Sequence, residues 1–224
     1  MKIDVLTLFP DMFSGFLNES IIKRAINNKK VEINIHNIRD YSLDPHKKVD
    51  DYPYGGGAGM VLMPQPIFDA VDALKTKDSV VILLTPQGGT YNQNMALNLS
   101  KMKHIILVCG HYEGFDERIR ILADYEVSIG DFVLTGGEVA SMAIIDSTVR
   151  LIDGVINKES YECDSFQNNL LDYPVYTHPF DYKGMKVPEV LLSGHHENIN
   201  KWRVQEQIKR TKERRPDLLE RGIK

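Results

Sequence analysis

The sequence lacks the marks of several large classes of protein. It has only two cysteines, Cys109 and Cys163, in 224 residues, too few for the disulfide framework of a small secreted domain. Its N-terminus, MKIDVLTLFP, places Asp4 inside a short apolar run that stops at Pro10, and this run is too short and too charged for a signal peptide. No stretch approaches the roughly 18 apolar residues that a membrane span requires. We therefore expect a cytoplasmic protein that contacts no membrane.

The composition is otherwise that of an ordinary globular protein, with 42% hydrophobic and 26% charged residues. The charges are unevenly distributed along the chain. From Lys201 to Lys224, nine Lys or Arg face four Asp or Glu, a net charge of +5, which leaves −9 on the first 200 residues of a chain whose net charge is −4. A basic tail on an acidic body indicates a polyanionic partner, although a solvated amphipathic helix explains the same charges equally well.

Strand-like and helix-like segments alternate along the first two thirds of the chain. Strands are predicted at 3–8, 31–38, 80–84, 105–108 and 127–129. Helices are predicted at 12–27, 67–74 and 139–151. Continuous apolar strands that alternate with helices are typical of a parallel sheet covered on both faces, so the predicted fold class is α/β.

The pattern is lost from about residue 153 to residue 169, where polar residues dominate. Such a stretch is typical of a linker or a mobile loop. Beyond it, an amphipathic helix is predicted at 197–212, with Ile199, Trp202 and Ile208 on its apolar side. We therefore divide the chain into an α/β domain at 1–158, a flexible linker at 159–174 and a small helical domain at 175–224.

Glycine-containing loops follow three of the predicted strands, at 85–89, 110–114 and 130–137. Ligands of open α/β sheets bind outside the carboxyl ends of the strands, and glycine lets a backbone approach a ligand closely. Three such loops in one sheet favour a ligand cleft over three ordinary turns. They match neither the dinucleotide fingerprint nor the P-loop. A fourth glycine cluster, at 55–59, fits either a ligand-wrapping loop or a merely flexible one, and by itself favours the flexible loop.

Six blocks of the sequence span nearly the whole chain, at 6–10, 49–60, 107–118, 128–138, 162–166 and 191–196. In this order they resemble the signatures of bacterial tRNA (guanine-N1-)-methyltransferases. Chance agreement of several long blocks is negligible. The chain is therefore identified as a member of this family.

The resemblance implies a SPOUT-type fold, in which the parallel sheet carries a deep C-terminal trefoil knot and a small helical domain follows. Residues 1–158 would be the methyltransferase domain and residues 175–224 the tRNA-binding domain. A knot does not follow from the strand pattern, because true knots are too rare to be expected. The resemblance also implies a homodimer in which both subunits build each active site.

The implied activity is a step of tRNA processing, the transfer of a methyl group from S-adenosylmethionine to N1 of guanosine at position 37, next to the anticodon. The residues that the resemblance assigns to the methyl donor are Thr85, Pro86, Gly110, Glu113, Ile129, Gly130, Asp131, Phe132, Val133, Leu134 and Gly136. Those that it assigns to the RNA substrate are Asp50, Gly55, Gly56, Gly57, Gly59 and Ser165.

N1 of guanine carries a proton at neutral pH, so its methylation needs a general base. The resemblance assigns this role to Asp164 in the linker, where a base acts only after RNA has ordered the loop. Without the resemblance, Asp164 is best interpreted as a solvated surface charge. Arg150 matches a functional arginine of the family and would stabilise negative charge on guanine O6. Its alternative role is that of an ordinary arginine at a helix C-terminus.

The family also depends on Mg²⁺, yet no metal ligands can be named. The acidic residues lack the spacing of a calcium loop, and the Cys and His residues lack that of a zinc site. One departure from the family is that the sequence ends at Lys224, where members commonly run on further; this affects the expected tRNA contacts rather than the catalytic region. Three alternatives remain: a SPOUT methyltransferase for rRNA or another tRNA base, a non-catalytic RNA-binding module, and a nucleotide-phosphate enzyme that uses the 55–59 loop.

Overall fold

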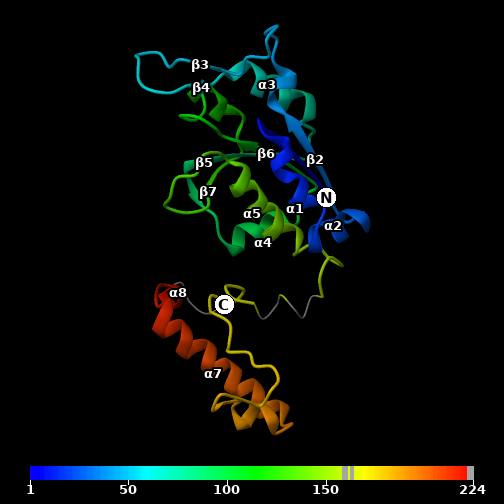
Figure 1. The fold of residues 1–224 in the computed structure, drawn as a ribbon, viewed down its shortest axis with the longest axis vertical. Coiled ribbons are helices and arrows are strands. Elements are labelled where there is room, and N and C mark those ends of the chain that lie inside the picture. Colours follow the sequence, from blue (N-terminus) through cyan, green and yellow to red (C-terminus); the bar gives the residue numbers. More distant parts are fainter. Residues whose placement is uncertain (158–160, 162–163, 221–224) are drawn as a thin grey trace. The chain divides into compact units, whose positions relative to one another are not determined.

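Five parallel strands form the central sheet, in the spatial order β2-β1-β6-β5-β7 (Figure 1). The strands are β1 (Lys2–Thr7), β2 (Glu32–Asn37), β5 (Ser79–Thr90), β6 (His104–Cys109) and β7 (Tyr125–Ser128). The computed structural model describes residues 1–157, 161 and 164–220. These residues form two units, Met1–Ile156 and Asn157–Lys224, and each is described by itself.

At the carboxyl edge of the sheet, β6 and β7 end beside the point where the regular pairing of β5 is interrupted. Leu84 of β5 pairs with Cys109 of β6 and with Val127 of β7. The ladder between β5 and β7 then skips from Leu84 to Gly89, which also pairs with Val127. Residues 85–88 therefore stand outside the ladder, beside the loops that follow β6 and β7.

Both faces of the sheet are buried under helices. Successive side chains of each strand point to opposite faces, so each strand contributes to two cores. Ile105 and Leu107 belong to a core shared with α1 (Ser14–Leu17), α2 (Ser20–Asn27), α4 (Gln93–Leu99) and α5 (Glu138–Val149). Ile106 and Val108 belong to a second core, shared with α3 (Pro64–Leu74) and the short 3-10 helices η2 (Ile38–Tyr41) and η3 (Glu117–Leu122). The prediction of a parallel α/β sheet covered on both faces is confirmed.

Two local predictions need correction. The single helix predicted at 12–27 is wrong, because the chain forms η1 (Pro10–Phe13), α1 and α2 in succession. Ser20 has a φ of 52°, in the left-handed region that a continuous helix does not contain. Helix α4 was not predicted, although Asn92 accepts a hydrogen bond from the Met95 amide at 3.1 Å, the usual signal of a helix start.

A small hairpin lies between β2 and β5 in the sequence. Its strands are β3 (Asp50–Asp51) and β4 (Val61–Leu62), which pair antiparallel. The loop between them holds the glycine cluster 55–59. Gly55, Gly56, Gly57 and Gly59 all have positive φ, from 79° to 129°, a conformation that L residues rarely adopt. The backbone of this loop therefore requires its glycines.

The second unit is built around α7 (His196–Arg214), which confirms the helix predicted at 197–212. It also contains the hairpin of β8 (Asp181–Tyr182) and β9 (Met185–Lys186), the 3-10 helix η4 (Glu189–Leu192) and α8 (Asp217–Glu220). Residues 158–160 and 162–163, which belong to the predicted linker and to one family block, lie outside the described residues. Within the described part of the chain, no helix combines the length and apolarity needed to cross a membrane.

Candidate active site

A cavity of about 360 Å³ lies at the carboxyl edge of the sheet. Most of its wall is formed by the irregular segment of β5 after Leu84 and by the loops that follow β6 and β7, the three segments that the sequence predicted for a ligand cleft. The lining residues are 84–87, 110–115, Glu117, Arg120, 127–130, 132–137 and Ala140. This is the place where open α/β sheets bind their ligands, and the volume falls in the range of small-molecule sites, roughly 300–1,000 Å³.

Two glycines allow the walls of this cavity to pack backbone against backbone. The Gly137 amide donates a hydrogen bond to the Gly110 carbonyl at 2.8 Å. A Cβ on Gly137 would lie 2.7 Å from Cys109 Cα, and a Cβ on Gly110 would lie 3.1 Å from the Phe115 ring and 3.2 Å from the Leu84 carbonyl oxygen. Side chains at either position would push the loops apart and enter the cavity wall.

A buried carboxylate stands beside the cavity at the start of α5. Glu138 is 2% exposed, and its Oε1 accepts a hydrogen bond from Thr7 Oγ1 at 2.7 Å. The N-terminus of a helix favours a negative charge at this position. Burial, and secondarily the charge of Glu138, raise the pKa of the Cys109 thiol far above its ordinary value. Cys109 is therefore a protonated core residue rather than a nucleophile.

His111 also faces this corner of the cavity. Its ring contacts the rings of Phe9 and Tyr112, at centroid distances of 4.9 Å and 4.8 Å. Its Nδ1 is buried and has no hydrogen-bond partner among the described residues. A Cβ on Gly136 would contact both His111 Nδ1 and the Glu138 carboxylate, so only glycine fits between these two polar side chains.

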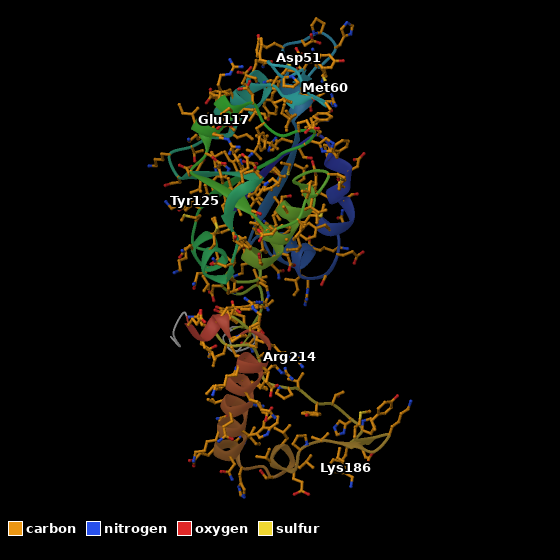
Figure 2. The ribbon with its side chains drawn as sticks, turned by 90° about the vertical axis from the view of Figure 1, so that its left-hand side faces the viewer. Asp51, Met60, Glu117, Tyr125, Lys186 and Arg214 are labelled. Atoms are coloured by element: carbon orange, nitrogen blue, oxygen red, sulfur yellow. The ribbon has the colours of Figure 1, made fainter. Side chains whose placement is uncertain are left out.

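The glycine-rich hairpin is attached to the same cavity. The Glu113 amide donates to the Met60 carbonyl and the Leu62 amide donates to the Gly114 carbonyl, both at 3.0 Å. A Cβ on Gly59 would lie 2.8 Å from Glu113 Cδ, so hairpin and cavity meet at Glu113. Asp51, at the end of β3, and Met60, just before β4, lie close together at the two ends of the glycine-rich loop (Figure 2).

The structure brings together ten of the eleven residues predicted to bind the donor. These ten line the cavity: Thr85, Pro86, Gly110, Glu113, Ile129, Gly130, Phe132, Val133, Leu134 and Gly136. Asp131 is on the same loop, but its side chain is exposed and is not part of the cavity wall. Of the predicted RNA-binding residues, Asp50 pairs with Leu62 in the hairpin, and the four glycines form the hairpin loop.

The remaining predicted residues lie elsewhere. Arg150 is the C-cap of α5, roughly 20 Å from Gly137 at 1.5 Å per helical residue, and it does not line the cavity. Asp164 and Ser165 belong to the second unit. The Asp164 amide donates to the Tyr161 carbonyl at 3.2 Å, and Ser165 Oγ accepts from the Asp172 amide at 2.9 Å.

Several cavity residues were missed by the residue-level prediction. His111, Tyr112 and Phe115 stand inside the 107–118 block, so the signal that identified Gly110 and Glu113 was available for them too. Arg120 lies just beyond that block. Its guanidinium contacts Gln87 and Glu126 and pairs with Glu117 Oε2 at 2.8 Å, so its charge is offset by two carboxylates at the cavity rim.

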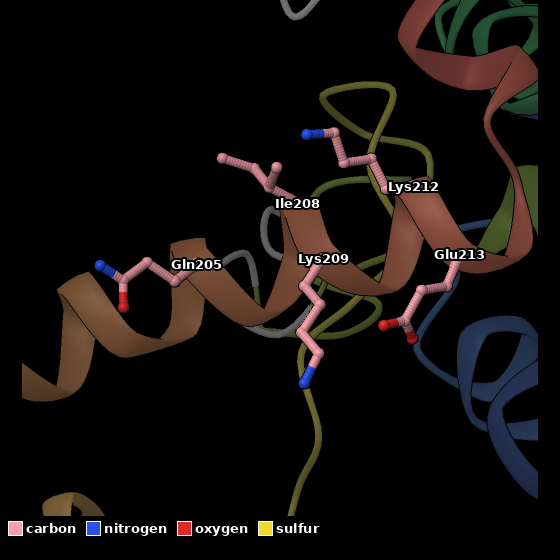
Figure 3. Close-up of a pocket in the computed structure, with 5 residues that line it drawn as sticks. All are labelled: Gln205, Ile208, Lys209, Lys212 and Glu213. Carbon is pink, nitrogen blue, oxygen red and sulfur yellow. The ribbon is translucent and has the colours of Figure 1, made fainter.

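The exposed surface of α7 carries several basic residues, including Lys209 and Lys212. A shallow hollow on this helix is lined by Gln205, Ile208, Lys209, Lys212 and Glu213. Figure 3 shows Lys209 and Lys212 extending from different sides of the helix. The hollow is formed by one helix alone, which suits contact with a large polyanion better than capture of a small molecule.

The fold and the cavity together define an α/β protein with a cavity of small-molecule size at its strand ends and a helical unit that contains a basic helix. The sequence profile of the tRNA (guanine-1)-methyltransferase TrmD family matches residues 1–221, and the chain belongs to this family.

Curated relatives agree over nearly the full length of the chain, and each of those compared is named tRNA (guanine-N(1)-)-methyltransferase. The relative from Malacoplasma penetrans is 59% identical and aligns over 100% of this chain and 99% of its own length. The relative from Halalkalibacterium halodurans is 58% identical, over 98% of this chain and 92% of its own length. The relative from Clostridium perfringens is 58% identical, over 99% and 94%.

Proposed function

We propose that this protein transfers a methyl group from S-adenosylmethionine to N1 of guanosine at position 37 of tRNA, next to the anticodon. The observation that carries the proposal is the meeting of two family blocks, 107–118 and 128–138, with residues 84–87 at one cavity, to which a third block, the glycine-rich hairpin, is attached at Glu113. When bound, S-adenosylmethionine supplies a methyl group on a positively charged sulfur.

The cavity suits this donor in size and in chemistry. Ile129, Phe132 and Leu134 provide apolar surface, and Gly110 at the end of β6 lines the cavity with its backbone. Free backbone groups at strand ends can read the polar edges of a nucleoside. The ten lining residues that the family resemblance assigns to the donor would hold it there.

The proposed fold is the SPOUT type with a deep trefoil knot. Its support is the close crossing of the loop after β7 over the end of β6, where Gly137 contacts Cys109 and Gly110 without an intervening side chain. A knot requires a chain to pass this closely through a neighbouring loop. Glycine at the crossing removes the steric obstacle.

Asp164 acts as the general base in this proposal. Its carboxylate takes the proton from guanine N1, which makes the nitrogen lone pair available for the methyl group. Negative charge then develops on guanine O6. Arg150 stabilises this charge with its guanidinium. Because Asp164 lies on a segment of the second unit, RNA that binds this unit brings base and substrate together.

The active protein is proposed to be a homodimer with shared active sites. Arg150 is far from the cavity along α5 within one chain, as derived above, so a partner subunit is a natural source of this residue. Exposed apolar side chains line the cavity and the start of α5: Phe132 (54%), Val133 (85%), Leu134 (37%) and Val139 (49%). Contiguous exposed apolar surface marks protein interfaces.

A resident Mg²⁺ site is not formed by the described side chains. Among them, no group of three His, Cys, Asp or Glu residues converges on one point. Mg²⁺ keeps several water ligands and often binds through substrate oxygens. Any Mg²⁺ would be held by RNA or donor oxygens with at most one or two carboxylates.

Replacement of Asp164 by Asn tests the mechanism. The variant keeps the size of the side chain and loses the basic carboxylate, so methyl transfer should fall by about 100-fold or more. Donor affinity by calorimetry and tRNA affinity by filter binding should stay near wild type. Turnover at the wild-type rate would remove Asp164 from the mechanism. As a substrate control, a transcript with adenosine at position 37 should not be methylated.

A further inference from the structure

The segment that carries Asp164 is fastened to α7 through a buried threonine. Thr211 is 0% exposed, and its Oγ1 accepts a hydrogen bond from the Leu171 amide at 2.9 Å. The same hydroxyl donates to the Gln207 carbonyl at 2.7 Å, one turn earlier in the helix. A helical threonine commonly makes only the second of these bonds. Here the hydroxyl also holds a backbone segment 40 residues away in the sequence.

Further hydrogen bonds lead from Leu171 to the proposed base. The next residue, Asp172, donates its amide to Ser165 Oγ at 2.9 Å, and Ser165 follows Asp164 directly in the chain. The Phe166 amide donates to the Leu170 carbonyl at 2.8 Å. Residues 165–172 therefore form a closed turn whose far side rests on Thr211 and whose near side adjoins Asp164.

Arginines of the second unit brace the same turn. Arg210 Nη1 donates to the Asp172 carbonyl at 3.1 Å. The guanidinium of Arg203 stacks 4.8 Å from the centre of the Tyr173 ring, and that of Arg215 lies 5.9 Å from the Phe166 ring. Part of the positive charge of this basic region is thus used to hold the turn, while Lys209 and Lys212 remain exposed.

We propose that Thr211 is a positioning residue for the methyl transfer. Its hydroxyl holds the 165–172 turn, and through it Asp164, in a fixed place on the helix whose exposed side meets the tRNA. Docking of tRNA on α7 then delivers the base as part of the same body. The inference rests on the proposed role of Asp164 and adds the residue that sets the position of its carboxylate.

The test compares Thr211→Val with Thr211→Ser in the full-length protein. Valine has nearly the shape of threonine but cannot accept the Leu171 hydrogen bond, so the turn loses its anchor. We expect kcat to fall about tenfold or more, with KM for tRNA and the dissociation constant for S-adenosylmethionine each within about twofold of wild type. Serine keeps the hydroxyl and should restore kcat to near the wild-type value. Equal kcat for all three proteins would overturn the proposal, as would a change confined to KM.

Two further variants separate the possible causes of a negative result. If Thr211→Val does not fold, Arg210→Met removes the Asp172 contact from the same turn and should produce the same loss of kcat.

In an Asp164→Asn background, Thr211→Val should add no further loss of kcat, because both changes act on one carboxylate. An independent loss would refute the coupling. If Asp164→Asn alone keeps full activity, the proposed base fails, whereas a loss with Asp164→Asn and none with Thr211→Val refutes only the positioning role.

Discussion

Replacement of Gly137 by Ala should distort the proposed donor site. A Cβ at this position would lie 2.7 Å from Cys109 Cα, 3.0 Å from the Gly110 amide nitrogen and 3.1 Å from Cys109 Cβ, whereas non-bonded carbon atoms prefer about 3.5–4.0 Å. Gly137 has a φ of −80° and a ψ of −4°, which alanine adopts without strain. The substitution therefore tests steric contact alone.

The two loops must separate by several tenths of an ångström or more to accept the methyl group. Overpacking of this kind costs about 1–3 kcal/mol, and the movement stretches the bond between the Gly137 amide and the Gly110 carbonyl. Part of this cost lowers the free energy of unfolding, and part distorts the cavity and lowers its affinity for the donor. If most of it affects the cavity, affinity for S-adenosylmethionine should fall by about 5- to 100-fold.

Isothermal titration calorimetry measures the donor affinity, and urea denaturation measures any loss in the free energy of unfolding. Gly15→Ala is the matched control, because a Cβ on Gly15 in α1 meets no atom within 4 Å. This control should bind the donor like wild type. A Gly137→Ala protein with wild-type affinity and wild-type stability would refute the argument that the loops cross here at backbone contact.

Two other predictions concern stability and assembly. Burial alone would raise the pKa of Asp4, but hydrogen bonds with Lys2, His36, Asn34 and His104 outweigh burial and lower it from 3.8 to about 2. Because the folded-state pKa lies below the unfolded one, this stabilisation is complete above about pH 4 and is lost as the pH falls toward 2. Asp4→Asn should lower the free energy of unfolding at pH 7 by about 2 kcal/mol and flatten the acid limb of a stability–pH curve; an unchanged limb would contradict the assignment. Val139→Glu should halve the mass measured by light scattering, because it places a charge on the apolar surface proposed for the dimer. Val204→Glu, at a side chain of similar exposure in the second unit (51% against 49%), should leave the mass unchanged, and a dimeric Val139→Glu protein would exclude this surface from the interface.

The sheet could be predicted because its strands are continuous apolar runs such as Ile105 to Val108, buried on both sides. The cavity followed from the rule that parallel strands end at one edge, which placed the loops after Leu84, Cys109 and Ser128 together. Glu138 was not recognised as a buried partner of Thr7, since the two residues are 131 positions apart. Pairings at that distance leave no periodic trace in a sequence.

The second unit shows the same limit more clearly. The polar residues before Asn169 predicted a linker, a prediction that rests on composition alone. The bond between Leu171 and Thr211 is a tertiary contact, and local propensity carries no information on it. The left-handed conformation of Ser20, which divides the predicted helix at 12–27, was equally invisible because serine is not a residue that usually marks it.

The activity proposed for this protein is methylation of N1 of guanosine 37 in tRNA. Unmodified tRNA transcripts incubated with the protein and S-adenosylmethionine, then digested and mapped by mass spectrometry, locate the added methyl group directly. We expect one methyl group on N1 of guanosine 37 and none on a transcript with adenosine there. A methyl group on another nucleotide or on another atom of the base, or no transfer from the donor, would contradict it.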